Sequence, residues 1–201
     1  MIDEVTERPK LTAKGARTRA RIVEAAAGLI HERGVANTTL DDIKVAAEVS
    51  GSQMYHYFPD KDHLVQAVID FQAETIVKHQ GHALSGAHGV EAWRSMVITA
   101  AQHTQAKGGC PLGSLSGQLA ETDPEARAHI AAGFEQWKAA IADGLKPLHA
   151  SGKLPPSIDL DDLATTLLAT VQGGTLLAQV QRNSRPFETS VNTLLALMID
   201  S

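Results

Sequence analysis

The polar side chains between Ser50 and Lys61 are of the kinds that bind nucleic acid. This segment reads SGSQMYHYFPDK, and it contains both tyrosines of the chain, Tyr55 and Tyr57. A glutamine can pair with the edge of an adenine, and a serine hydroxyl can donate to or accept from a base. A phenol and a lysine ammonium are groups that commonly contact phosphate. The residue types therefore predict a surface that touches both bases and backbone.

A short helix over this segment would sort its side chains onto two faces, because each residue turns by about 100°. The apolar face carries Met54, Tyr57 and Phe58. The opposite face carries Ser52, Gln53, Tyr55 and His56. The pattern favours a helix held down by one face and displayed by the other. An ordinary helical hairpin with a polar, solvated face is the alternative.

The preceding residues supply a second short helix and a tight turn. Thr38 or Thr39 can cap a helix that has Asp41 and Asp42 in its first turn, where acidic groups are favourable. Ser50 can cap the displayed helix, and Pro59 ends it because proline disfavours α conformation in the residue before it. We therefore predict a helix-turn-helix over residues 39–58, after an amphipathic helix over residues 16–33.

The rest of the chain also reads as helical. Apolar spacing and capping residues predict further helices at residues 61–80, 90–107, 112–122, 124–150, 159–182 and 186–199. No strand-like alternation is present. We expect an all-α protein of about nine helices, with a DNA-binding domain at 16–76 and a second helical domain at 77–201.

Charge is distributed unevenly along the chain. The formal net charge is −5, but six basic and no acidic residues lie between Arg8 and Arg21. This run can meet phosphates or form a solvated tail. The mildly acidic remainder argues against an architectural protein that coats nucleic acid. The N-terminus has no apolar region of a signal peptide, and no apolar run reaches membrane-spanning length.

Catalytic and metal-binding patterns are weak. The segment CPLGSLSG lacks the spacing of a serine nucleophile elbow, and KGGCPLGS is not a phosphate-binding loop. His79 and His82 have the spacing of a metal pair, without an apparent third ligand. The single cysteine, Cys110, excludes an internal disulfide and fits a reducing, cytoplasmic setting. We expect no enzyme activity, no cofactor and no metal, and we give an inert thiol preference over a redox switch.

The two segments IVEAAAGLIHERG and TTLDDIKVAAEVSGSQMYHYFPDKDHLVQAVI resemble the DNA-binding domain of the TetR family of bacterial transcriptional repressors. The resemblance covers residues 16–76 and rests on Gly34, Thr39, Ile43, Ala47, Val49, Ser50, Tyr55, Phe58, Lys61 and Leu64. Two positions depart from the family pattern. Glu48 stands where the family usually has glycine, and Lys44 stands where it usually has alanine.

The resemblance implies contacts with double-stranded DNA at particular positions. Phosphate contacts are implied for Thr39, Tyr55 and Lys61, and base contacts for Ser52, Gln53 and His56. Arg17 would touch the backbone or the minor groove, and Lys44 and Ser50 complete the expected DNA-binding set. Tyr57 stays open, since the helix wheel turns it to the core while family members can turn this position to a phosphate.

The resemblance also implies a homodimer and an effector pocket, and the apolar patterns of the later helices agree. We expect the dimer interface at Leu163, Leu167, Val171, Gly174, Leu177, Val191, Leu194, Leu195 and Met198. An intramolecular core is the alternative for this set. We expect the pocket to be lined by Trp93, Met96, His103, Phe134, Trp137 and Gln172, with plain core packing as the alternative for each.

The expected function is that of a regulator, most simply a repressor that a small hydrophobic or aromatic effector releases from a palindromic operator. In this hypothesis the effector shifts the helix at 61–80 and changes the spacing of the two displayed helices. The segment GGCPLGSLSGQLAETDPEARAHI resembles the LmrA/YxaF-type subgroup, which is linked to multidrug or aromatic ligands. A helical small-molecule-binding protein or enzyme without DNA binding is the alternative.

Overall fold

The computed structural model describes residues 11–84 and 88–199 of the chain. Arg8 and Lys10 of the basic run lie outside these described residues, as do residues 85–87 between the helices predicted at 61–80 and 90–107. The chain forms two compact units, Met1–Leu64 and Val65–Ser201. Because the division falls inside a helix, the expected boundary at 76/77 stays a proposal.

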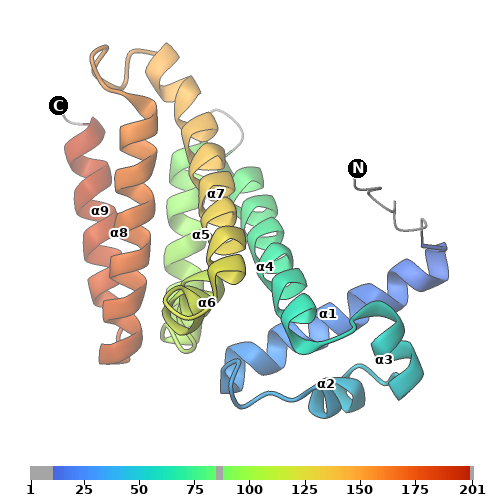
Figure 1. The fold of residues 1–201 in the computed structure, drawn as a ribbon. Helices are drawn as coiled ribbons and strands as arrows, with labels where there is room; N and C mark the ends of the chain where they lie inside the picture. The colour runs from blue at the N-terminus through green and yellow to red at the C-terminus, as the bar shows by residue number, and fades with distance from the viewer. Residues whose placement is uncertain (1–10, 85–87, 200–201) are drawn as a thin grey trace. The chain divides into compact units, whose positions relative to one another are not determined.

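The first unit consists of three helices and the first turn of a fourth (Figure 1). It contains α1 (Ala13–Arg33), α2 (Leu40–Ala46) and α3 (Gly51–Tyr57), and α4 (Lys61–Leu84) begins within it. The side chains of Ile22, Ile43 and Met54 are buried, one from each of the first three helices. These are the apolar positions that the sequence spacing places on inward faces, so the helix-turn-helix is confirmed.

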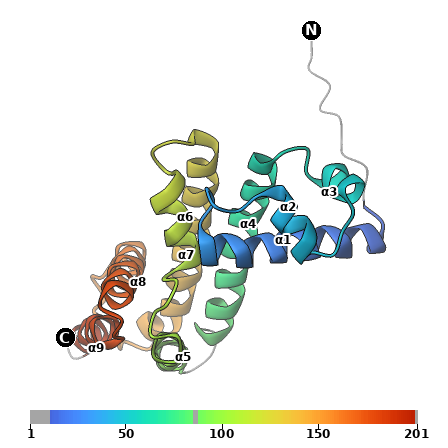
Figure 2. The same cartoon turned by 90° about the horizontal axis from the view of Figure 1, so that it is seen from below.

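The second unit continues from α4 through five more helices. They are α5 (Gly89–Thr104), α6 (Pro111–Leu119), α7 (Pro124–Ala150), α8 (Leu160–Gln181) and α9 (Arg185–Ile199). Helix α8 packs along both α7 and α9, and α8 and α9 lie side by side in both views (Figures 1 and 2). The described residues therefore form nine helices and no strand, which confirms the all-α fold.

Capping residues fix the helix ends where the sequence places them. Asp123 accepts from the N–H of Ala126 and precedes Pro124 at the first position of α7, and Asp159 caps α8. Pro147 lies inside α7, which continues beyond it to Ala150. Helix α5 is shorter than expected, because Gln105 and Ala106 adopt left-handed conformations directly after it.

The core of the second unit is built around two tryptophans. Trp93 and Trp137 are 1% and 2% exposed, and the indole N–H of each donates to Oε1 of Gln80 at 2.8 Å. One amide oxygen on α4 thus satisfies two buried donors, from α5 and α7, whose burial would otherwise be costly.

Among the described residues, α8 is the one helix long and apolar enough to cross a membrane by length and composition alone. Its residues Leu163, Leu167 and Val171 belong to the core of the second unit. The core helix of a soluble protein can have the same length and composition, and α8 contributes to the core in this way.

Candidate nucleic-acid interface and effector cavity

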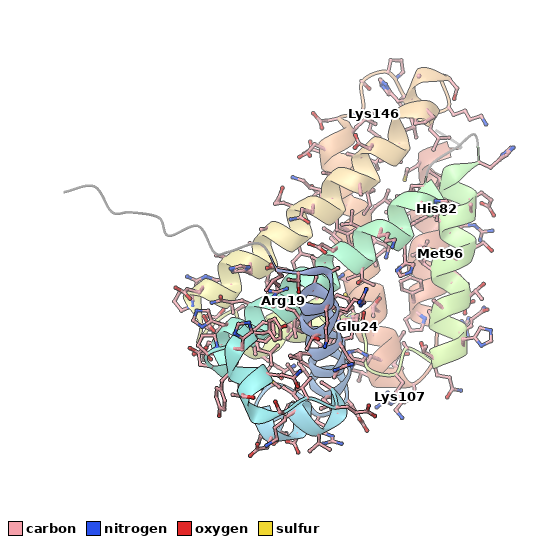
Figure 3. The ribbon with its side chains drawn as sticks, turned by 90° about the vertical axis from the view of Figure 1, so that its right-hand side faces the viewer. Arg19, Glu24, His82, Met96, Lys107 and Lys146 are labelled. Carbon is pink, nitrogen blue, oxygen red and sulfur yellow. The ribbon has the colours of Figure 1, made fainter. Side chains whose placement is uncertain are left out.

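Helix α3 is anchored by its apolar face. Met54 and Phe58 are 1% and 2% exposed, while Tyr55 on the other side is 62% exposed. The guanidinium of Arg19 on α1 lies 5.1 Å from the centre of the Phe58 ring, a cation–π distance that ties α1 to the end of α3. Figure 3 marks Arg19 on α1. Ser52, Gln53 and His56 are exposed beside Tyr55, so the predicted display face is present.

Tyr57 takes an intermediate position. Its side chain is half-buried, its ring meets that of His56 edge-on at 4.8 Å, and its hydroxyl lies against Gly15 on α1. A Cβ at position 15 would stand 3.2 Å from this hydroxyl oxygen, so the close approach favours glycine there. Tyr57 therefore packs over the first turn of α1, and its hydroxyl reaches the N-terminal region of that helix.

Two capping boxes hold the starts of α2 and α3. In α2, Thr39 Oγ1 accepts from Asp42 N and Thr39 N donates to Asp42 Oδ2 at 2.9 Å. In α3, Ser50 Oγ accepts from Gln53 N at 3.2 Å and Ser50 N donates to Gln53 Oε1 at 3.0 Å. These reciprocal bonds satisfy backbone N–H groups that have no partner within the helix. Each box engages side chains that we expect at the DNA, namely Thr39, Ser50 and Gln53.

The three expected cationic contacts differ in their surroundings. Arg17 is exposed on α1, and Lys44 pairs with Asp41 on the surface of α2. Asp41 raises the pKa of Lys44 through a side-chain hydrogen bond. Lys61 donates from Nζ to the backbone oxygen of Val35 at 2.6 Å, which ties the start of α4 to the loop after α1. An ammonium has three N–H bonds, so this contact leaves donors for a phosphate.

Glu48 has a φ of 51°, in the left-handed region, directly after α2. This is the position where the family pattern usually has glycine. A left-handed conformation costs a residue with a Cβ about 1 kcal/mol or more. Arg21 Nη2 lies 3.5 Å from the Glu48 carbonyl oxygen, which places a basic side chain of α1 beside the turn.

A cavity of about 450 Å³ opens between α6, α7 and α8 in the second unit. It is lined by Cys110, Gly113, Ser114, Ser116, Gly117, Phe134, Gln172, Gly173, Thr175, Leu176 and Gln179. Gln172 donates from Nε2 to the Cys110 sulfur at 3.4 Å. A Cβ added at Gly113 would lie only 2.6 Å from Gln172 Oε1. Only glycine leaves this space, so Gly113 lets the amide of α8 reach the start of α6.

A larger cavity of about 860 Å³ lies at the other end of the unit. Its walls include Val90 on α5, Pro147 on α7 and Pro155 in the loop that follows. None of the six residues expected to line a pocket is among its lining residues.

The comparisons with known proteins agree with this geometry. Residues 22–68 match the family model for bacterial regulatory proteins of the tetR family. Residues 86–194, more than half of the chain, match the model for the tetracyclin repressor-like C-terminal domain. The chain belongs to the TetR family. Members of this family are transcriptional regulators that bind DNA and small-molecule effectors and act as dimers, and in general they are not enzymes.

Individual relatives match this TetR-family chain over nearly its whole length. HTH-type transcriptional regulator MT0206 of Mycobacterium tuberculosis is 27% identical over 192 residues, covering 90% of this chain and 94% of the relative. The repressor DhaR of Mycobacterium sp. is 25% identical, and the match covers 91% of this chain and 93% of DhaR. The solved structure of a TetR transcriptional regulator from Chloroflexus aurantiacus superimposes on this one with a TM-score of 0.75 at 27% identity. The match covers 91% of this chain and 94% of that one. The chain is therefore a DNA-binding transcriptional regulator with an N-terminal helix-turn-helix.

The expected pocket residues separate into three groups in this TetR-family structure. Trp93 and Trp137 are buried in the core, and Met96 packs half-buried against it from α5 (Figure 3). Phe134 and Gln172 line the cavity between α6, α7 and α8. His103 is exposed near the end of α5 and belongs to neither cavity. The six residues are therefore not brought together into one site.

Most of the residues expected at the dimer interface lie in the chain's own core. Seven of the nine are buried within the chain's own second unit: Leu163, Leu167, Val171, Gly174, Val191, Leu195 and Met198. They belong to the core in which α8 packs against α7 and α9. Leu194 is half-buried, and only Leu177 is well exposed, at 53%. This burial favours the intramolecular core, which was the alternative for this set, and the dimer interface stays a proposal.

The sequence reasoning missed the outer apolar face of the last two helices. Leu176, Val180 and Leu197 are 60%, 74% and 66% exposed, beside Leu177. It also missed Gln80 and the small residues of the cavity. Gly113 and Gly117 are four residues apart, which places two positions without a Cβ on one face of α6, and this spacing was a readable signal.

Among the described residues, no cluster of three His, Cys, Asp or Glu side chains could hold a metal ion. His79 instead forms a hydrogen bond from Nδ1 to the backbone oxygen of Thr75 at 2.8 Å, within its own helix.

Proposed function

We propose that this regulator is a repressor that binds a palindromic operator as a homodimer and is released by a small hydrophobic or aromatic effector. The observation that carries the DNA-binding part is helix α3, anchored by Met54 and Phe58 and displaying Tyr55 on the opposite side. A helix of this size fits the major groove, where base edges differ in their donors and acceptors. The relative named as a repressor, DhaR, supports the negative sign of regulation.

Within this interface, Ser52, Gln53 and His56 are proposed to face bases. Thr39, Tyr55 and Lys61 are proposed at phosphates, joined by Lys44 in the last turn of α2 and by Ser50 at the start of α3. Arg17 is proposed to reach the backbone or minor groove from α1. The proposed DNA-binding domain keeps the expected bounds of 16–76.

The proposed dimer interface is the outer face of α8 and α9. It is marked by the exposed side chains Leu176, Leu177, Val180 and Leu197. A shallow groove between the two helices, lined among others by Thr170, Thr189 and Thr193, continues the same face. Exposed apolar side chains grouped this way are typical of a surface that a partner covers. A symmetric contact would then set the spacing of two α3 helices on a two-fold operator.

The proposed effector site is the cavity between α6, α7 and α8. Its volume of about 450 Å³ lies in the range of small-molecule sites, and the Phe134 ring and Leu176 supply apolar contact area. The polar groups at its wall are hydroxyls, amides and one thiol, with no carboxylate or ammonium among the lining residues. This lining suits an uncharged, partly aromatic molecule, in keeping with the resemblance of residues 108–130 to the LmrA/YxaF-type subgroup.

Release requires an effector that binds two conformations unequally, because equal binding shifts no equilibrium. Helix α4 is the element that runs from the first unit into the second, through Lys61 at one end and Gln80 near the other. We propose that it carries the change from the effector site to the spacing of the α3 helices. The regulator is proposed to work in the cytoplasm, where its DNA lies.

The deciding experiment is a gel shift with the DNA upstream of the protein's own gene, at moderate salt and with excess competitor DNA. A sequence-specific shift that small aromatic compounds reverse supports the proposal. A protein that binds such compounds but shifts no DNA would instead be a helical small-molecule-binding protein. Replacing Lys61 with Ala should weaken binding to all sequences alike and reduce its salt dependence.

A further inference from the structure

The amide of Gln53 is held in one orientation by the cap of its own helix. Its oxygen accepts from the backbone N–H of Ser50 at 3.0 Å, while its backbone N–H donates to Ser50 Oγ at 3.2 Å. Ser50 Oγ also lies 3.0 Å from Ser52 Oγ, so the three side chains form one connected group at the start of α3. The side chain is exposed, yet its acceptor is already in use.

This matters for base reading because glutamine recognises adenine with both ends of its amide. The oxygen accepts from adenine N6–H and the nitrogen donates to N7, side by side in one plane. In the capped conformation the oxygen points back to the helix start, so the adenine pair requires either loss of the cap or a second bond on the same oxygen. The capping box does not use the two N–H bonds of Nε2.

We propose that Gln53 reads DNA as a hydrogen-bond donor, and that it selects guanine rather than adenine. Guanine presents two neighbouring acceptors in the major groove, O6 and N7, and both can accept from one NH₂ group. Adenine presents one acceptor beside a donor, so an NH₂ group facing it meets an N–H at N6. Because the cap uses the amide oxygen, the Gln53 side chain offers the base mainly its Nε2 donors. This inference rests on the proposed function of α3.

Glutamate and alanine at position 53 separate the two roles of this side chain. Gln53→Glu keeps an oxygen for Ser50 N–H, since glutamate is a usual capping-box partner, but it has no N–H to donate. Gln53→Ala loses both the cap and the donor. The second capping box supplies a matched control, because Asp42→Ala removes the same bond from the start of α2 without touching α3.

The experiment selects bound sequences from a randomised double-stranded DNA library with the full chain and the three variants. The base pair that Gln53 faces is the one whose preference changes in Gln53→Ala. We expect guanine there for the wild type. Gln53→Glu should lose this guanine preference at an unchanged melting temperature, and Asp42→Ala should keep the wild-type consensus. Replacing that guanine with hypoxanthine, which keeps O6 and N7, should preserve affinity. Replacing it with 7-deazaguanine should weaken binding by roughly tenfold, the size of one lost base contact.

Adenine at the Gln53-dependent pair would overturn the inference, because Gln53 would then have left its cap on binding. A consensus unaffected by Gln53→Ala would also overturn it, because the side chain would serve the helix cap alone. If the wild type selects no sequence while its melting temperature is normal, the proposed function fails and the inference fails with it. Selection of a defined operator with adenine at this pair would leave the proposed function standing.

Discussion

Trp137 on α7 and Gln80 on α4 are joined by a hydrogen bond of 2.8 Å from the indole N–H to the amide oxygen. The same oxygen accepts from Trp93 on α5, so one polar side chain serves two of the most buried aromatic residues. The three helices that form the centre of the second unit therefore meet at a single acceptor.

Replacing Gln80 with Leu should destabilise the protein by about 2–4 kcal/mol. The substitution leaves two indole N–H groups without their acceptor, and each unsatisfied buried donor costs about 1–3 kcal/mol. Urea unfolding monitored by tryptophan fluorescence measures the change. Gln80→Glu, which keeps an acceptor oxygen at the same place, is the matched control and should recover most of the loss. Equal destabilisation by both variants would mean that the hydrogen bonds contribute little.

Replacing Glu48 with Gly should stabilise the protein by about 0.5–1 kcal/mol. The residue has a φ of 51°, and glycine adopts this conformation without the Cβ clash. Thermal unfolding is the measurement, and an upward shift in melting temperature is expected. Glu48→Ala removes the charge but keeps the Cβ, so it should give no such gain. A gain in the alanine variant would assign the effect to charge instead of backbone strain.

Charges placed on the outer face of α8 should separate the dimer without unfolding the subunit. Leu177→Asp combined with Val180→Asp puts two carboxylates at residues that are 53% and 74% exposed in the single chain, outside the proposed effector cavity. Sedimentation at micromolar concentration should show monomers with an unchanged helical circular dichroism signal. Val45→Asp on α2, which is 73% exposed, is the control and should stay dimeric. A dimer that survives the double substitution would place the interface elsewhere.

Filling the proposed effector cavity should weaken effector binding without changing operator binding. Gly117 lines this cavity, and a Cβ at that position meets no atom within 4 Å. Gly117→Phe should therefore be accommodated, keep operator affinity and raise the effector concentration needed for release by tenfold or more, a change of about 1.4 kcal/mol. Gly81→Phe on α4, where a Cβ also meets no atom within 4 Å, is the control. Unchanged release in Gly117→Phe would exclude this cavity as the site.

The Thr39–Asp42 capping box should make stability fall in acid. Hydrogen bonds from the Thr39 side chain and backbone hold the pKa of Asp42 below its usual value of 3.8. The carboxylate therefore contributes stability above that value, and the contribution is lost as pH falls through the lowered pKa of the folded state. Asp42→Asn should flatten the decline of melting temperature below about pH 4. A decline as steep as that of the wild type would assign the acid sensitivity to other carboxylates.

Much of the first unit could be predicted from the sequence, because its signals are local. Ser50 and Pro59 delimit α3 through capping and through the conformation of the residue before proline, within the chain segment itself. The period of the helix then assigns Met54 inward and Tyr55 outward, as observed.

What the sequence alone determined is therefore the set of helices, the caps of α2, α3, α7 and α8, and the display face of α3. The tertiary structure decided which apolar side chains are buried within the chain and which are exposed. Helix α8 is apolar on more than one side, so periodicity could not separate Leu167, buried against neighbouring helices, from Leu176, exposed on the outer face. It also decided which polar groups are already engaged. A hydrogen bond such as that from Lys61 to Val35, or from Trp137 to Gln80, joins residues far apart in sequence, and only the packed chain brings its two ends together.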